Sequence, residues 1–377
     1  MASISVSAAS VSVPTVEHPL KNPHYRLWLA GGTISFLGDQ FYLVALPWLV
    51  LQQTGSAVAM GAIMMAGAIP RAVLMLMGGA VSDRLSARKI MMATATARTL
   101  CVTVIGLLVW LRVLQIWELY ALAFAFGVAD AFAAPAQSAY MPSLVKREQL
   151  VAASSVSQST AQLTTIVGPV PAGFVIQALG VAWAFFLDAI SFLFIIGALW
   201  KLSDPPKTPA KKPMWHSIAE GISYVAKDVP LRSLMLLAII MNFCVCGPVT
   251  VGLAYFAKTS FGSPAAYGTL ISSLAAGSLM GAVLAGLWKI RKRGFLIPIV
   301  AMVLGLCLSS IALAERTWSV AAILVVMGAA AGMLNVHIGA WAMQRIDIAV
   351  RGRVSSVLML AVFGVAPISL GMAGFLV

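Results

Sequence analysis

The stretch GSAVAMGAIMMAGAIPRAVLMLMGGAVSDRLSARK occupies residues 55–89, and part of it returns 207 positions later in the chain. Asp83 is lost in the second copy, where Ile290 takes its place. Such a repeat predicts one helical bundle built twice, with the acid kept in one copy only. The residues that recur are Gly55, Ser56, Gly61, Gly79 and Arg84, which return as Gly262, Ser263, Gly268, Gly286 and Arg291.

Composition assigns the chain to a membrane. Of its 377 residues 60% are apolar and 10% are charged, and the mean hydropathy is +0.95. Soluble domains carry about 25% charged residues. We therefore expect an all-α polytopic membrane protein and exclude a soluble domain. The four cysteines all fall in apolar stretches, so neither a disulfide framework nor a metal site is expected.

Apolar runs long enough to cross a hydrocarbon core of about 30 Å occur eleven times. The predicted spans are 25–52, 56–79, 90–112, 117–139, 152–178, 181–200, 233–257, 265–288, 295–314, 317–343 and 353–377. They divide the chain into a disordered tail (1–24), a six-helix bundle (25–200), a linker (201–232) and a five-helix bundle (233–377).

The 25 Lys and Arg residues are unevenly placed between the two sides of these spans. Arg112, Lys258 and Arg316 fall on one side, Arg71 and Arg98 lie inside spans, and the others fall in the tail and in the connections after even-numbered spans. Basic connections stay in the cytoplasm. The tail and the linker are therefore predicted to be cytoplasmic, and the net charge of +13 calls for no nucleic-acid partner.

A second register, offset by 201 residues, aligns the fifth span with the eleventh. It pairs Gly127 with Gly328 and Gly173 with Gly374. The sixth span, 181–200, has no counterpart before Val377. We therefore expect six plus five helices, with a twelfth helix absent from a naturally short or truncated chain.

Several strings resemble the major facilitator superfamily, and within it the branch of macrolide-efflux proteins and siderophore (enterobactin) exporters. The matching strings are Ser35-Phe-Leu-Gly38-Asp39, Ala45-Leu46-Pro47-Trp48, Thr54-Gly55-Ser56-Ala57, Asp83-Arg84 with Arg88-Lys89, and Phe186-Leu-Asp188-Ala-Ile-Ser-Phe192. The resemblance implies a fold of two pseudo-symmetric bundles and the export of a drug, a macrolide-like compound or a siderophore.

Three carboxylates lie at membrane depth: Asp39, Asp130 and Asp188. A charge at the centre of a membrane helix costs about 2.5–3.5 kcal/mol, so each is expected to face the bundle interior. There it either binds the transported proton or forms an ion pair with Arg71 or Arg98, and the sequence leaves both roles open. Asp188 ranks last, because its span resembles a peripheral helix of the superfamily.

The loop after the second span is a candidate conformational latch. In the superfamily that it resembles, this loop joins spans 2 and 11 and holds one access state, so Asp83 would face Arg353. A solvated charged turn is the alternative. The latch candidates are Gly79, Asp83, Arg84, Arg88, Lys89 and Arg353.

Polar residues at helical spacing predict the lining of a substrate cavity. Ser35, Asp39 and Tyr42 follow spacings of four and three, which places them on one face of a helix. Hydrogen bonds between helices are the alternative for each candidate. The lining candidates are Ser35, Tyr42, Gln137, Gln158, Gln162, Thr165, Asn242 and Asn335.

The chain is not expected to be an enzyme. It contains no Gly-Lys dipeptide, hence no P-loop, and no HExxH or GxSxG string. We expect a secondary antiporter in a bacterial cytoplasmic membrane, working as a monomer on a bulky amphipathic small molecule. No cofactor or metal is expected, and a proton gradient is the expected driving force. A channel, a non-transporting membrane partner or an inactive truncated carrier is the alternative.

Overall fold

The computed structural model describes residues 18–204, 214–287, 293–347 and 351–377, and within these ranges it is helical without a strand. Ten helices are long and apolar enough to cross a membrane, and a shorter apolar helix covers Leu296–Ile311. Each of the eleven predicted spans falls on a helix or on consecutive helices, which confirms the all-α membrane fold.

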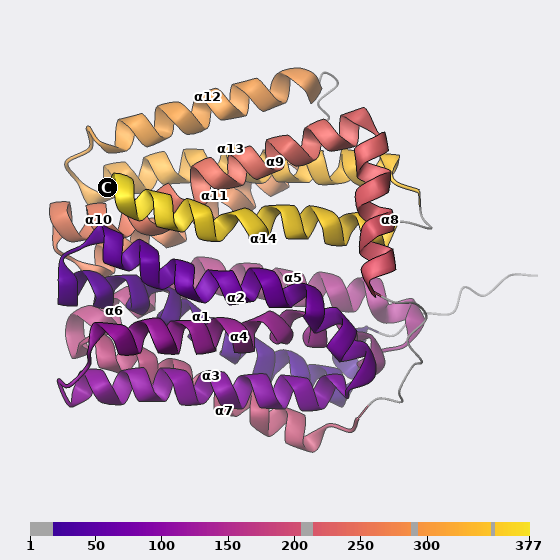
Figure 1. The fold of residues 1–377 in the computed structure, drawn as a ribbon, viewed down its shortest axis with the longest axis horizontal. Coiled ribbons are helices and arrows are strands. Elements are labelled where there is room, and N and C mark those ends of the chain that lie inside the picture. Colours follow the sequence, from indigo (N-terminus) through magenta and orange to yellow (C-terminus); the bar gives the residue numbers. More distant parts are fainter. Residues whose placement is uncertain (1–17, 205–213, 288–292, 348–350) are drawn as a thin grey trace, which may run out of the picture.

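The first half is built from long helices joined by short turns (Figure 1). Its predicted fifth span divides at Gly168, because Pro169 supplies no backbone N–H to continue the helix. The elements are η1 (Pro19–Lys21), α1 (Pro23–Thr54), α2 (Ala57–Arg84), α3 (Ala87–Trp110), α4 (Ile116–Tyr140), η2 (Met141–Leu144), η3 (Arg147–Gln149), α5 (Leu150–Val167), α6 (Pro169–Leu179) and α7 (Val181–Lys201).

The second half repeats this path. Its first helix contains two π-helical turns, η4 and η5, where the first half has the unbroken helix α1. The elements are α9 (Val229–Gly247), η4 (Pro248–Gly252), α10 (Leu253–Phe256), η5 (Ala257–Phe261), α11 (Pro264–Leu287), α12 (Arg293–Ile311), α13 (Thr317–Arg345) and α14 (Arg351–Leu376).

The region that the sequence predicts as a linker contains helix α8 (Met214–Lys227), which that prediction missed. Apolar residues recur there at 215, 218, 222 and 225, a helical spacing in a segment too short and too polar to span a membrane. Figure 1 shows α8 lying across the ends of the other helices. The boundaries of the two bundles remain predictions.

The recurring Gly-Ser pairs have a local explanation. Gly55 and Gly262 end α1 and η5 in the left-handed conformation, with φ of 64° and 59°, which a residue without Cβ adopts readily. Ser56 and Ser263 then cap the next helix by accepting the N–H of Ala59 and Ala266, each at 3.2 Å. The repeat therefore encodes the same turn twice.

Glycines also bring the two halves together where α2 packs on α14 and α6 on α11. A Cβ added to Gly61 would lie 2.9 Å from the Cα of Gly374, and one added to Gly268 would lie 2.1 Å from the carbonyl oxygen of Pro169. Both contacts lie at the end of the bundle that carries the Gly55 and Gly262 turns. Backbone therefore meets backbone across the interface at this end.

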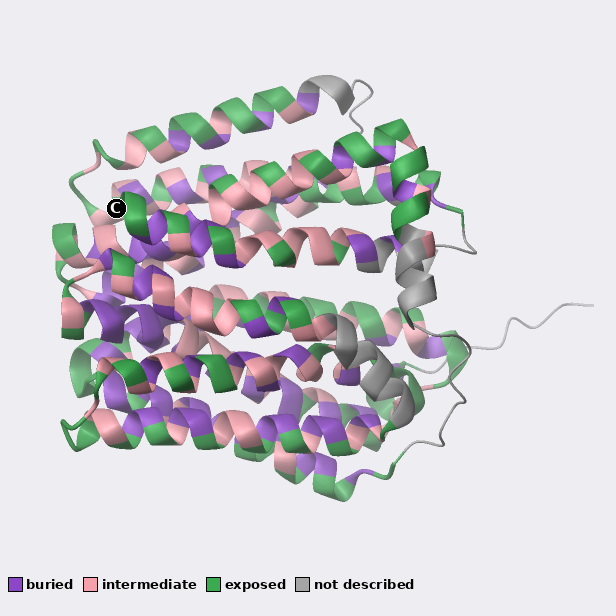
Figure 2. Ribbon diagram, viewed as in Figure 1, coloured by how far each residue is buried: buried purple, intermediate pink, exposed green. Residues whose placement is uncertain are grey.

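The outer surface is apolar, as a lipid-facing surface must be. Leu100, Val104 and Leu107 are exposed along one face of α3, and Ile299 and Met302 are exposed on α12. Figure 2 shows exposed residues along α12 and α3, and buried residues on the helices of the first half as well as on α14. Exposed apolar side chains of this kind are typical of a protein whose outer surface contacts lipid.

Candidate transport site

A cavity of about 520 Å³ lies inside the first half. Its wall comes from α1, α2, α3, α4, α5 and α7, and Leu370 of α14 is the one second-half residue among the described residues that line it. A cavity of this volume is within the range of about 300–1,000 Å³ that is typical of small-molecule sites. The first half therefore supplies nearly all of the candidate site.

Helix α1 contributes the polar face that its spacing predicts. Ser35, Asp39 and Tyr42 all line the cavity. The Tyr42 ring stacks on Phe126 of α4, with the ring centroids 4.2 Å apart. The tyrosine is therefore held against the wall, and the Asp39 carboxylate lies one turn away from it on the same face.

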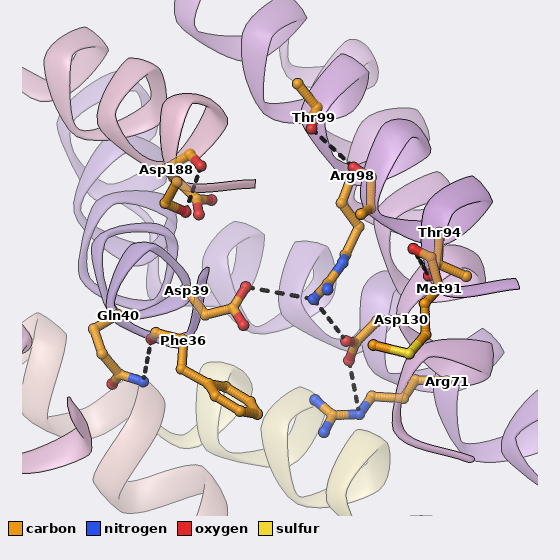
Figure 3. Close-up of polar contacts among 12 residues, drawn as sticks. Phe36, Asp39, Gln40, Arg71, Met91, Thr94, Arg98, Thr99, Asp130 and Asp188 are labelled. Carbon is orange, nitrogen blue, oxygen red and sulfur yellow. Dashed lines mark hydrogen bonds and ion pairs between the residues drawn. The ribbon is translucent and has the colours of Figure 1, made fainter. Parts of the chain in front are cut away.

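Four charged side chains form a chain across this cavity (Figure 3). Arg98 Nη1 of α3 lies 3.4 Å from Asp39 Oδ1 and 3.3 Å from Asp130 Oδ1. Arg71 Nε of α2 lies 3.1 Å from Asp130 Oδ2 on the other side. Asp39 is therefore ion-paired with Arg98, and Asp130 with both Arg98 and Arg71. The sequence offered proton binding and ion pairing as alternative roles for these acids, and the residues proposed for the first role also form the ion pairs.

Arg98 is positioned by aromatic rings as well as by charge. Its guanidinium carbon lies 4.5 Å from the centre of the Phe192 ring and 5.9 Å from that of Phe126. Its Nε is buried and has no hydrogen-bond partner among the described residues. Both carboxylate contacts are at the long end for charge-assisted hydrogen bonds. One donor group is thus shared between two acids without being tightly bound to either.

In this arrangement, a proton that binds to Asp39 would replace the ion pair between Asp39 and Arg98. With both acids ionised, the charges of Asp39 and Asp130 balance those of Arg71 and Arg98. A proton added to Asp39 removes the negative charge that holds one side of Arg98, and the guanidinium is then held by Asp130 alone. Protonation would therefore change which helices the arginine connects.

Asp188 lies outside the cavity wall. It is fully buried on α7, and neither carboxylate oxygen has a hydrogen-bond partner among the described residues. It faces the backbone of α1, because a Cβ added to Gly38 would lie 2.7 Å from Asp188 Oδ1. The sequence places it among the acids at membrane depth but does not show that α1 packs directly on it.

The other lining candidates divide into two groups. Gln137 and Thr165 line the cavity, whereas Gln158, Gln162, Asn242 and Asn335 are not among its lining residues. On α5 the cavity is lined by Ala161, Thr164 and Thr165, so Gln162 is turned about a quarter of a circle away. Gln158 and Asn335 are exposed, and Asn242 belongs to α9 in the second half.

The described part of the predicted latch loop contacts the end of α7. Arg88 Nε donates to the carbonyl oxygen of Leu199 at 2.6 Å, and Arg88 Nη1 lies 3.8 Å from Asp204. The Ser86 hydroxyl also bonds Asp204, and it accepts the backbone N–H of Lys89 at 3.3 Å. This part of the loop is therefore tied to the end of α7. The side chains of Asp83, Arg84 and Arg353 lie outside the described residues, and so do the surroundings of Gly79.

Sequence reasoning missed the aromatic and glycine parts of the site. Phe126 and Phe192 contact Arg98, and Phe363 of α14 lies under the Arg71 guanidinium, 5.5 Å from ring centre to Cζ. Phe192 follows Asp188 by four residues, which is a usable signal that both lie on one face of α7. No spacing links Phe363 to Arg71, because they belong to different halves.

Comparison with known proteins identifies the family. Residues 28–371 match the family model of the Major Facilitator Superfamily. Macrolide efflux protein A of Streptococcus pyogenes is 26% identical over 76% of this chain and 71% of its own length. Multidrug efflux pump Tap of Mycolicibacterium fortuitum is 29% identical over 65% of this chain and 62% of its own length.

Solved structures agree on the fold. A bacterial homologue of the human lysosomal transporter Spinster matches with a TM-score of 0.72 at 14% identity, over 95% of this chain and 82% of that chain. A D-xylose-proton symporter matches with a TM-score of 0.69 at 13% identity, over 93% of this chain and 89% of that chain. The chain therefore belongs to the Major Facilitator Superfamily and is a multi-pass membrane transporter of small molecules.

Proposed function

We propose that this transporter exports a bulky amphipathic compound, of the macrolide-like or multidrug kind, in exchange for protons. The observation that carries the proposal is that Arg98 is shared between Asp39 and Asp130 inside a cavity of about 520 Å³. A proton and a substrate can compete there for the same charges, and such competition couples an antiporter. The efflux relatives support the outward direction.

The character of the cavity wall favours a large and partly apolar compound. Beside the ion pairs, the wall carries aromatic and thioether side chains, which adapt to substrates of different shape. A sugar would need many more hydrogen-bonding groups. The apolar lining residues include Phe36, Leu46, Met64, Met91 and Phe126.

Alternating access is supported by the way the halves meet. Besides the glycine contacts, Lys258 lies over the Trp48 ring at 4.8 Å, and the Ser263 hydroxyl donates to Gln177 Oε1 at 2.8 Å. All of these contacts lie at the end opposite the basic connections. Given the orientation predicted from those connections, this is a state closed toward the outside, with the cavity reached from the cytoplasm.

Transport into inverted membrane vesicles or proteoliposomes tests the proposal, with erythromycin and ethidium as probes. We expect saturable transport that requires a pH gradient and is lost in Asp39→Asn and Asp130→Asn. Glu315→Gln removes an exposed carboxylate from the connection before α13 and should leave transport unchanged. Saturable transport without any dependence on the pH gradient would refute the coupling, and flux that does not saturate would indicate a pore.

A further inference from the structure

The buried carboxyl of Asp188 is the one acid at membrane depth that the proposed exchange does not use. Its side chain has no exposed surface, and both oxygens lack a hydrogen-bond partner among the described residues. The neighbouring Ser191 hydroxyl donates to the backbone oxygen of Asp188 at 2.7 Å. An ionised carboxylate there would be a buried charge without an ion pair or hydrogen bond among the described residues, which is strongly unfavourable.

Charge balance in the surrounding cluster leads to the same conclusion. Asp39 and Asp130 already neutralise Arg71 and Arg98. A third ionised acid would leave the group with one unbalanced negative charge inside the membrane. The neutral, protonated form of Asp188 leaves the cluster with no net charge.

The Asp188 carboxyl lies against the backbone of α1 at Gly38, the residue before Asp39. Gly38 precedes Asp39, and a Cβ at this position would meet the Ser191 hydroxyl and lie 2.7 Å from Asp188 Oδ1. The absence of a side chain at Gly38 therefore lets α7 bring its acid against α1 directly beside the acid of the cavity. Figure 3 shows Asp188 on one side of Asp39, with Arg98 reaching toward Asp39 from another helix.

Arg98 is placed to follow a charge that moves between these two acids. Its guanidinium rests on Phe192, one turn beyond Asp188 on α7. Its Nε has no hydrogen-bond partner among the described residues, and its contact to Asp39 is long at 3.4 Å. Turning toward α7 would cost Arg98 one weak contact and bring a free N–H donor toward Asp188.

We infer that Asp188 is a second proton-binding residue, which passes its proton to Asp39 while Arg98 shifts from Asp39 to Asp188. The O–H bond on Asp188 breaks and an O–H bond forms on Asp39, with water carrying the proton between the two carboxyls. The negative charge moves the opposite way, so the total charge of the cluster is unchanged. This inference rests on the proposed proton coupling and adds a proton site behind the cavity wall.

The groups that face Asp188 come from the two helices packed against it. Helix α1 contributes Asp39 and Tyr42, and α3 contributes Arg98, while Cys101 of α3 faces Tyr42. Helix α6, which also contacts α7, has no titratable residue in Pro169–Leu179. Among these groups Asp39 is the acceptor that the cavity exposes, and Arg98 is the one cation.

Infrared spectroscopy of the purified transporter at neutral pH tests the site without requiring transport. The C=O band of a protonated carboxyl should be present in the wild type, absent in Asp188→Asn and retained in Glu315→Gln. It should also be lost in Asp39→Asn, because Arg98 then has no partner at residue 39 and moves to Asp188. An unchanged band in Asp188→Asn, or an undiminished band in Asp39→Asn, would overturn the inference.

Proton release on substrate binding gives a second readout. Adding ethidium or erythromycin to the protein in weakly buffered detergent solution should release one proton fewer from Asp188→Asn than from the wild type. Equal release would overturn the inference. A wild type that releases no proton would refute the proposed coupling itself, and the infrared bands would still decide whether Asp188 holds a proton. The Asp39→Asn arm leaves residue 188 intact, so poor folding of Asp188→Asn does not decide the result.

Discussion

The two halves of this transporter follow the same path but differ in charge. The four charged residues of the cavity cluster have uncharged counterparts throughout the second half. At the offset of 207, Asp39, Arg71 and Arg98 correspond to Cys246, Ser278 and Gly305, and at the offset of 201 Asp130 corresponds to Ala331. The second half therefore shows that this helical path needs no intramembrane charge. A charge is costly in a membrane, so the retention of four charges in the first half fits the proton exchange proposed above.

What the halves share is close backbone packing. In the first half a Cβ on Gly127 of α4 would lie 2.0 Å from the carbonyl oxygen of Gly67 of α2. At the corresponding place in the second half, a Cβ on Gly328 would lie 2.2 Å from the carbonyl oxygen of Leu274. The duplicated glycines thus preserve the close packing of helices in both halves, whereas the intramembrane charges of the cavity cluster occur in the first half alone.

The halves also differ at their peripheral faces. In the first half α7 packs against both α1 and α3. In the second half two apolar cavities of about 320 and 330 Å³ lie between the corresponding segments, lined by residues of α9–η5, α12 and α13. The packing that buries Asp188 against α1 therefore has no described counterpart in the second half.

The largest effect is expected from Arg98→Gln. It leaves Asp39 and Asp130 without their shared counter-charge, and breaking a buried ion pair in this way costs about 3–5 kcal/mol. We expect loss of transport and a clear fall in the thermal unfolding temperature in detergent. Gly305→Ala, at the equivalent place in α12, has no atom within 4 Å of the added Cβ and should keep the wild-type unfolding temperature. Equal losses in both variants would contradict a difference between the halves.

Moving the carboxylate of residue 39 to the second half tests whether transport needs this acid beside Arg98 or only somewhere in the membrane. The double variant Asp39→Cys and Cys246→Asp carries the carboxylate in the second half, where Gly305 replaces the arginine. We expect erythromycin transport driven by a pH gradient to fall about 5- to 150-fold, the range of a coupling free energy of about 1–3 kcal/mol. Cys246→Ser alone should transport normally. Full activity of the exchanged protein would show that either half can couple.

The shared packing predicts equal effects in the two halves. Gly127→Ala and Gly328→Ala each force a Cβ against a carbonyl oxygen, and overpacking of this kind costs about 1–3 kcal/mol. Both should lower the unfolding temperature to a similar extent, measured in detergent at pH 7. Gly197→Ala in α7, where a Cβ meets nothing within 4 Å, is the control. An effect confined to one half would mean that the glycines do not serve the same purpose.

The smallest effect concerns the first helix of each half, which Asn22 and Asp228 cap. Burial would raise the pKa of Asp228, but the N–H of Leu231 and the Arg345 guanidinium outweigh it and hold this pKa below its usual value. A lowered pKa stabilises the folded state above about pH 4 and stops doing so as the pH falls below it. Asp228→Asn should therefore be less stable than the wild type at pH 7 but not at acidic pH. Asn22→Ala should lose the same stability at both.

Much of the fold was predictable because membrane insertion imposes a strong pattern. Apolar runs of about 20 residues and the unequal placement of basic residues are local signals, and all eleven spans fall on helices. Helix α8 was not predicted, because the composition of an amphipathic surface helix resembles that of a polar connection. Its periodicity was the available signal.

The site was predictable in its residues but not in its pairing. Asp39, Asp130, Arg71 and Arg98 stand out as charges in apolar spans. Nothing in the sequence says that one arginine lies between two acids, because this depends on how α1, α3 and α4 are arranged in space. The same holds for Arg88, whose contact with the end of α7 no sequence pattern indicated.

The glycine contacts between Gly61 and Gly374, and between Gly268 and α6, also bear on how fast the transporter can work. Where backbone packs against backbone, few side chains are immobilised and few side-chain hydrogen bonds cross the interface. Separating the halves therefore restores little side-chain entropy and breaks few hydrogen bonds. Its barrier to opening should be low compared with that of an interdigitated interface. Each transport cycle must open and reclose this contact, so turnover would slow if bulkier residues locked the halves together.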